Sequence, residues 1–174
     1  KRIEFMQIAI DLSYKGMLNN DGGPFGCVII KDGIEVGRGW NKVTSTNDPT
    51  AHAEIIAIRD ACKNLQTHQL DGCEIYTSCE PCPMCLGAIY WARPSKVYYA
   101  NTRLDAAAIG FDDSLIYNEL TLSLPERKLS MELLFHPDAA KVFEVWKTKD
   151  DIAEENKYDI DEIVKKLKIK LRKL

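Results

Sequence analysis

The chain has 174 residues, a length that suits one domain, and 45% of its residues are hydrophobic, so a stable core needs no disulfides. Its 23 Lys and Arg against 26 Asp and Glu argue against a generally basic coat for nucleic acid. No apolar run reaches the roughly 18 residues of a membrane-spanning helix, and residues 1–10 lack the order of a secretory signal. We therefore expect a soluble, cytoplasmic protein with no membrane contact.

The spacing of hydrophobic residues predicts the secondary structure along the chain. In chain order we expect a helix over 3–18, strands over 26–31 and 34–40, a helix over 51–62, a strand over 74–77, a helix over 82–92, a strand over 96–100, connecting structure over 103–120, a strand over 129–135 and a helix over 137–149. Asp32-Gly33 between the first two strands is a strong hairpin signal. The alternation of helices and strands predicts an α/β sheet with helices on its faces.

The last segment of the chain, 160–174, has apolar residues at a sustained spacing of three and four, which predicts an amphipathic helix. Acidic residues lie at its start and basic residues at its end, as a helix dipole favours. We expect this helix to pack on its own domain or on a partner subunit. The alternative is contact of its basic end with nucleic acid or a membrane surface.

Three of the six cysteines lie within seven positions, at Cys79, Cys82 and Cys85, which indicates chemistry and not a disulfide framework. The other three are dispersed among apolar neighbours and are expected to be core residues: Cys27, Cys62 and Cys73.

The combination of His52 with Cys82 and Cys85 predicts a zinc site. Two cysteines three residues apart at a helix start share one face, and the positive end of the helix dipole favours their thiolates. One histidine and two thiolates suit Zn²⁺, and three protein ligands are typical of a catalytic site. Glu54, two residues after the histidine, is placed to act as a general base towards water.

Histidine-x-glutamate followed by proline-cysteine-x-x-cysteine is the signature of zinc-dependent nucleobase deaminases. The runs Asp48-Pro49-Thr50-Ala51-His52-Ala53-Glu54 and Ser78-Cys79-Glu80-Pro81-Cys82-Pro83-Met84-Cys85 resemble the cytidine-deaminase-like superfamily. Three further runs resemble the bacterial-type guanine deaminases: Gly22-Gly23-Pro24-Phe25-Gly26, Gly87-Ala88-Ile89-Tyr90-Trp91-Ala92-Arg93 and Gly110-Phe111-Asp112-Asp113-Ser114. The resemblance extends from about residue 3 to residue 146.

This resemblance implies a three-layer α/β/α fold with a central five-stranded mixed sheet flanked by helices. It implies one Zn²⁺ per subunit, with hydrolysis of guanine to xanthine and ammonia through attack of zinc hydroxide on C2 and Glu54 as proton shuttle. We therefore assign residues 1–149 to a zinc-dependent deaminase domain and residues 150–174 to a C-terminal extension. The expected substrate is a small purine base, and we expect no nucleic acid partner.

Five residues are candidates for binding the base. The Asn41 amide can both donate to and accept from a purine edge, or it is a turn residue. By similarity to the family, Asp113 accepts hydrogen bonds from guanine, the alternative being a helix N-cap. Phe25 and Trp91 are candidates for stacking on the base, or they are core aromatics. The backbone amide of Ala53 is the fifth candidate.

The resemblance also implies a homodimer whose subunits exchange C-terminal segments, with an aromatic residue near the end closing the partner's site. This sequence departs from that pattern, because it continues beyond Trp146 through 148–156 and adds the helix over 160–174. Tyr158 is the candidate for the closing aromatic residue. The added helix would then replace or reinforce the exchange in the dimer interface.

Several alternatives stay open at this point. A tRNA-specific adenosine deaminase shares the zinc motif and would use the basic end of the last helix for phosphates. Guanosine or another aminated ring, such as a triazine, is an alternative substrate. The non-enzymatic alternative is an inactive zinc-binding interaction module. At the metal itself, Cys79 could close a structural four-ligand site, or start an iron–sulfur pattern whose fourth position is Ile89.

Overall fold

The computed structural model describes residues 1–149, which fall into two compact units divided between Ser130 and Met131. The first unit is Lys1–Ser130, and residues 131–149 are the described part of the second. The expected extension over 150–174, with Tyr158 and the amphipathic helix, lies outside the described residues, so the boundary at 149 stays a prediction. Within 1–149, no helix is long and apolar enough to cross a membrane.

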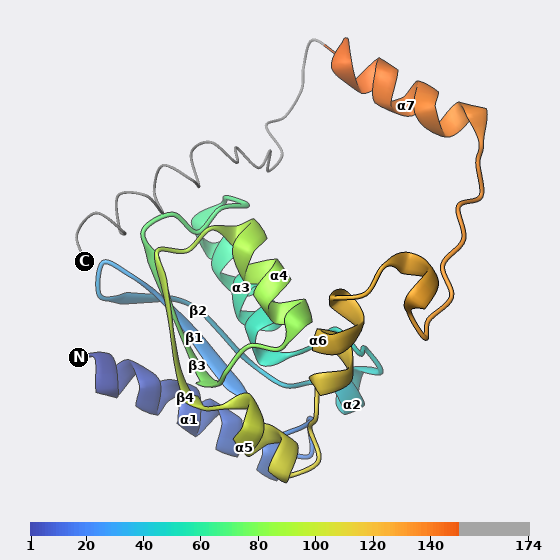
Figure 1. Cartoon of the computed structure of the whole chain (residues 1–174). Coiled ribbons are helices and arrows are strands. Elements are labelled where there is room, and N and C mark those ends of the chain that lie inside the picture. Colours follow the sequence, from blue (N-terminus) through green and yellow to red (C-terminus); the bar gives the residue numbers. More distant parts are fainter. Residues whose placement is uncertain (150–174) are drawn as a thin grey trace, which may run out of the picture. The chain divides into compact units, whose positions relative to one another are not determined.

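The first unit is built on a four-stranded mixed sheet with the order β2-β1-β3-β4 (Figure 1). Its strands are β1 (Gly26–Lys31), β2 (Ile34–Trp40), β3 (Cys73–Cys79) and β4 (Lys96–Asn101). β1 is antiparallel to both β2 and β3, whereas β3 and β4 are parallel. β1 lies inside the sheet and has helices over both faces, which explains why its sequence is a nearly continuous apolar run.

Helices cover both faces of this sheet, giving three layers (Figure 1). α1 (Arg2–Leu18) packs through Ala9 on the face formed by Val28, Ile30 and Tyr76. The opposite face is covered by α3 (Ala53–Leu65) and α4 (Pro83–Ala92), whose buried residues form the larger core cluster with the other strand positions. Alternate residues of a strand point to opposite faces, so one strand supplies both cores.

Two glycines of β2 let α3 lie unusually close to the sheet. A Cβ atom added at Gly39 would lie 2.4 Å from the Ala53 carbonyl oxygen, and one at Gly37 would lie 2.6 Å from the Ala61 nitrogen. The alanines that face them on α3 are fully buried: Ala53, Ala57 and Ala61. The start of α3 is therefore held against β2 by backbone contact with no side chain between them.

The structure confirms the expected helices over 3–18, 51–62, 82–92 and 137–149 and the first four strands, with ends shifted by a few residues. The segment 103–120 differs from the expected connecting structure, because it forms α5 (Arg103–Ala108) and α6 (Ser114–Leu120). A capping box between Thr102 and Asp105 starts α5. Two further short elements are α2 (Val43–Thr46) and the 3₁₀ helix η1 (Leu124–Glu126).

The expected strand over 129–135 is wrong for the described residues, which hold four strands and not five. This segment spans the boundary between the two units and has no ladder partner within residues 1–149. Its apolar side chains are exposed, with Leu133 at 89% and Leu134 at 92%. A strand needs a neighbour for its backbone hydrogen bonds, and alternating hydrophobicity alone does not supply one.

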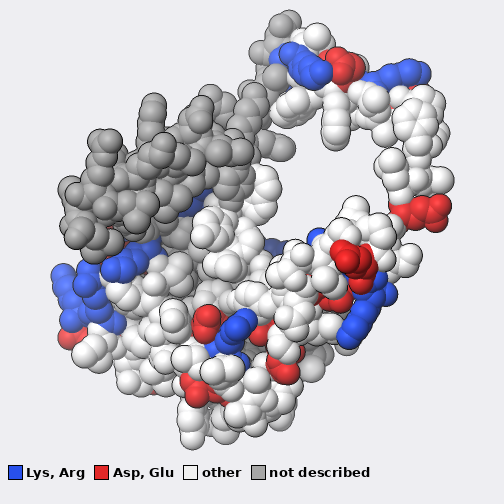
Figure 2. All heavy atoms as spheres, in the orientation of Figure 1, with Lys and Arg blue, Asp and Glu red and all other residues white. Residues whose placement is uncertain are grey.

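The described part of the second unit contains α7 (Pro137–Lys147). The His136 ring accepts a hydrogen bond from the Asp138 amide at 3.2 Å, and Pro137 occupies the first turn, so both residues help to start the helix. The face of the molecule in Figure 2 carries both acidic and basic side chains, with a group of mostly basic side chains at its left edge.

Candidate metal centre and active-site cavity

The three expected metal ligands come together at the starts of two helices. His52 is the N-cap residue of α3, Cys82 is the N-cap residue of α4, and Cys85 lies in the first turn of α4. The His52 Nδ1 atom lies 3.5 Å from each of the two sulfurs, and the three donor atoms all lie within 4.8 Å of one another. The positive ends of both helix dipoles are therefore directed at the same point, where they favour thiolates.

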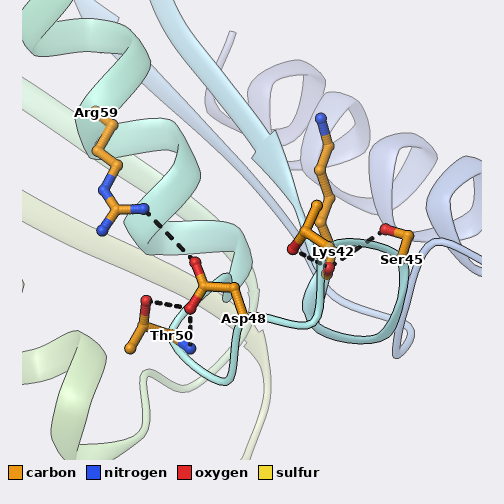
Figure 3. Close-up of polar contacts among 6 residues, drawn as sticks. Lys42, Ser45, Asp48, Thr50 and Arg59 are labelled. Carbon is orange, nitrogen blue, oxygen red and sulfur yellow. Dashed lines mark hydrogen bonds and ion pairs between the residues drawn. The ribbon is translucent and has the colours of Figure 1, made fainter.

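The loop before α3 is fixed by Asp48 (Figure 3). Its Oδ1 atom accepts hydrogen bonds from the Thr50 amide at 2.8 Å and the Thr50 hydroxyl at 2.7 Å, and its other oxygen lies 4.0 Å from the Arg59 guanidinium. Such turns are characteristic of aspartate two residues before the bonded amide. The turn brings His52 to the helix start in an extended conformation, with its ring towards the cysteines.

Electrostatics within the cluster favours metal binding. Hydrogen-bonding contacts with the Cys85 side chain and with the His52 ring lower the pKa of Cys82 to about 4, which favours its thiolate. The same contact with Cys82 raises the pKa of Cys85, and burial adds to this effect. Zinc binding replaces that shared proton, and the set of one imidazole and two sulfurs is one that zinc prefers. The cluster is thus able to hold one zinc ion.

Cys79 does not join this cluster. Among residues 1–149, the three-residue group His52, Cys82 and Cys85 is the metal-binding cluster that forms. Burial raises the pKa of Cys79 to about 11, and its thiol donates to the Thr102 carbonyl at 3.6 Å. The arrangement therefore argues against both the closed four-ligand site and the iron–sulfur alternative.

The Glu54 carboxyl group lies next to the metal cluster and is 6% exposed. The Thr77 hydroxyl donates to its Oε1 atom at 2.9 Å, and the Cys85 thiol donates to its Oε2 atom at 3.3 Å. Burial raises the pKa of Glu54, which brings it towards the range in which a carboxyl group both takes up and releases protons. Sequence reasoning identified Glu54 but missed Thr77.

A cavity of about 580 Å³ opens onto this cluster, within the usual range for small-molecule sites. Six of the expected site residues line it: Phe25, Asn41, His52, Glu54, Cys82 and Asp113. Three others do not line it, and they are Ala53, Cys85 and Trp91. Ala53 and Cys85 are buried residues of the helix starts, whereas Trp91 is 52% exposed. It follows Cys82 by nine residues, about 13 Å along a helix, and so lies towards the far end of α4.

The aromatic wall of the cavity is formed by Phe25 and Phe111. Their rings meet edge to face at 4.9 Å and 90°, and Gly23 packs against both, because a Cβ atom there would lie 2.9 Å from the Phe111 ring and 3.1 Å from the Phe25 ring. Sequence reasoning missed Phe111, although it immediately precedes the acidic pair at 112–113. An aromatic residue two positions before the candidate Asp113 was the sequence signal that could have identified Phe111 as part of the base-binding site.

Asn41 and Asp113 occupy the polar parts of the lining. The Asn41 Oδ1 atom accepts a hydrogen bond from the Val43 amide at 3.0 Å, so the turn role is present and the amino end of the side chain is left for the cavity. Asp113 stands at the N-cap position of α6, yet its side chain makes no capping hydrogen bond. Burial raises its pKa. Arg103 and Glu80 also line the cavity and were missed by sequence reasoning.

Comparisons with known proteins agree with this geometry. The sequence model of the cytidine and deoxycytidylate deaminase zinc-binding region matches residues 1–101. Guanine deaminase of Bacillus subtilis is 52% identical over 143 residues, which cover 82% of this chain and 92% of that protein. A tRNA-specific adenosine deaminase of Aquifex aeolicus is 44% identical over 77 residues, covering 44% of this chain and 51% of that protein.

The crystal structure of the Bacillus subtilis guanine deaminase superposes with a TM-score of 0.86 at 49% identity, covering 88% of this chain and 98% of that one. The similarity therefore includes the fold, the metal ligands' motif and nearly the whole length of that relative. The ligand cluster, the sheet order and these matches together show that the chain belongs to the family of zinc-dependent cytidine and deoxycytidylate deaminases and, within it, to the guanine deaminase branch.

Proposed function

We propose that this protein hydrolyses guanine to xanthine and ammonia. The observation that carries the proposal is the position of the Glu54 carboxyl group beside the cluster of His52, Cys82 and Cys85, in a cavity sized for a small molecule. The high identity to a guanine deaminase over most of both chains supports guanine as the substrate.

Zinc, when bound by these three residues, acidifies water and so supplies a nucleophile at neutral pH. Glu54 takes the proton that this water loses, because its Oε2 atom faces the cluster and its burial keeps solvent from competing. It then delivers this proton to ring N3 of guanine. As a C2–O bond replaces the C2–N bond, Glu54 carries the second proton of the water to the C2 amino group, which leaves as ammonia. Water is consumed, the C2–N bond breaks, and no redox partner is needed.

The lining of the cavity supports recognition of a purine base. The amino end of Asn41 donates to a ring or carbonyl acceptor, and the Asp113 carboxylate accepts from an N–H group. Phe25 and Phe111, whose rings contact each other in the cavity wall, supply an apolar surface for the ring of the base. The Ala53 amide and Trp91 remain candidate contacts from sequence alone, as does Tyr158, which lies outside the described residues.

The first experiment incubates the zinc-loaded protein with guanine, guanosine, cytosine, cytidine and tRNA carrying adenosine-34, and follows ammonia release. A Glu54→Gln variant with the same zinc content is the matched control, because it keeps the side-chain shape without the proton-accepting carboxylate. We expect ammonia from guanine, absent in the variant. Inosine in tRNA without guanine turnover would replace the proposal by adenosine deamination, and zinc binding without any turnover would favour the interaction module.

The acidic residues of the cavity lining favour a neutral base over tRNA. Glu80, Asp112 and Asp113 line the cavity beside one arginine, Arg103. A polyanion entering the cavity meets like charge, whereas uncharged guanine does not. The lining thus agrees with the expectation that nucleic acid is not a partner.

We also propose a homodimer with exchanged C-terminal segments, located in the cytoplasm. Apolar side chains are exposed on each unit taken by itself: Tyr90 and Trp91 on α4, and Phe135 and Phe143 in the second unit. All six cysteines are free thiols, which suits a reducing compartment. A monomeric mass by light scattering at micromolar concentration would contradict the dimer.

A further inference from the structure

Thr77 is a polar residue in an otherwise apolar layer of the core. β3 directs Cys73 and Ile75 into the cluster beneath α3 and α4, and the alternation continues to Thr77, which is 1% exposed and pairs with the buried Cys27 of β1. Tyr76, in between, points to the α1 side. Valine would fill this position with the same shape and without a hydroxyl group that has to be satisfied.

The hydroxyl group of Thr77 is satisfied by the carboxyl group of Glu54. It donates to Oε1 at 2.9 Å, whereas Oε2 receives the Cys85 thiol at 3.3 Å. The two oxygens are therefore distinguished: one is directed at the sheet and the other at the metal ligands. Torsion about the last bond of a glutamate is broad and roughly two-fold, so without a fixed donor this distinction is not maintained.

Of the two side-chain donors to the Glu54 carboxyl group, only Thr77 keeps its proton in the metal-loaded protein, where the Glu54 backbone N–H is the remaining donor. Cys85 binds zinc as a thiolate and then has no proton to donate. Thr77 is not itself a member of the metal cluster, its β-branched side chain is restricted about χ1, and its strand is paired on both sides, with Cys27 and with Tyr99. It is thus a rigid donor.

We propose that Thr77 is a positioning residue, which holds Glu54 Oε1 so that Oε2 stays directed at the metal cluster and carries the proton. This inference rests on the proposed function, in which Glu54 moves protons. It predicts that losing the Thr77 hydroxyl slows the chemical step and leaves substrate binding intact, because Thr77 does not line the cavity.

The test compares Thr77→Val and Thr77→Ala with Thr77→Ser, and uses Ile75→Val as a control for packing in the same core layer. We expect kcat to fall about 10- to 100-fold in the valine and alanine variants, the range for a hydrogen bond to a charged group. KM should stay within about twofold and zinc at about one per chain, because neither the cavity nor the ligands change. The serine variant should recover kcat to within about threefold of wild type, although its χ1 is freer.

Three results would overturn the proposal: an unchanged kcat in both hydroxyl-free variants, a loss equal to that of Ile75→Val, or failure of serine to restore kcat. Loss of zinc with loss of kcat would assign Thr77 to the fold and not to Glu54. The rate ratio is taken on whichever base the wild-type protein turns over. Absence of guanine turnover by the wild type therefore refutes the proposed substrate separately from the role of Thr77.

Discussion

Replacing Gly39 by alanine should impair the active site through a contact that involves no catalytic side chain. The added Cβ atom would lie 2.4 Å from the Ala53 carbonyl oxygen and 2.6 Å from the Ala57 nitrogen, whereas ordinary contact begins at 3.4 Å. All the closest atoms belong to α3, and two of them are backbone, so no flexible side chain can move aside. The start of α3 must move about 1 Å from β2, and it carries both His52 and Glu54.

A displacement of about 1 Å at a catalytic group can lower the rate about 100-fold, and overpacking typically lowers the free energy of unfolding by about 1–3 kcal/mol. We therefore expect Gly39→Ala to fold, to bind zinc more weakly and to lose about 100-fold in kcat/KM for guanine. Steady-state kinetics, zinc titration and urea denaturation measure the three effects.

Gly87→Ala is the matched control for this substitution. It lies in α4, and apart from its chain neighbours and the backbone of that helix no atom of residues 1–149 lies within 4 Å of the added Cβ. Alanine in a helix is favoured over glycine by about 1 kcal/mol, so this variant should be slightly more stable and fully active. A folded Gly39→Ala protein with kcat/KM within threefold of wild type would refute the view that backbone contact places α3.

Four further variants test individual contacts. Cys82→Ser should abolish stoichiometric zinc binding, because it removes one of the three metal ligands. Cys79→Ala should retain one zinc per chain, because the Cys79 thiol donates to a backbone carbonyl and does not belong to the metal cluster. Measuring the zinc content of each purified variant tests both expectations. Trp40→Phe removes the indole hydrogen bond to Asp21 at 2.8 Å, and should lower the free energy of unfolding by about 1.5–3 kcal/mol, the range for a bond to a charged group. A smaller loss in denaturant titrations would mean that water replaces the indole N–H as the donor to Asp21. Burial raises the pKa of Tyr76 to about 12, so the folded protein keeps a proton that the unfolded chain loses above about pH 10. Stability should therefore fall between about pH 10 and 12, and less steeply in Tyr76→Phe, as measured by denaturation at each pH.

Local sequence patterns were sufficient for most of the fold. The hairpin of β1 and β2 was predicted with the bounds that the structure has, because Asp32-Gly33 and two Val- and Ile-rich runs determine it locally. The segment 129–135 has a similar apolar content and forms no strand among the described residues. The difference is that a hairpin carries its own pairing partner, whereas an isolated segment depends on one from elsewhere.

The metal ligands and Glu54 were also readable from the sequence, because each motif lies within a few residues at a helix start and helix geometry then directs the side chains. Thr77, Phe111 and Arg103 could not be read in this way. They reach the cavity or Glu54 from β3 and from the segment after β4, and no local spacing relates them to His52.

The sequence by itself thus determined the chemistry of this protein: a histidine, two cysteines and a glutamate whose types and spacing define a zinc-dependent deaminase. Only the tertiary structure decided which residues surround that chemistry. It placed Phe111 in contact with Phe25, left Trp91 on the surface, and set the Thr77 hydroxyl against Glu54. The physical reason is that motif geometry follows from a single helical turn, whereas a cavity wall depends on how separate elements pack across the sheet.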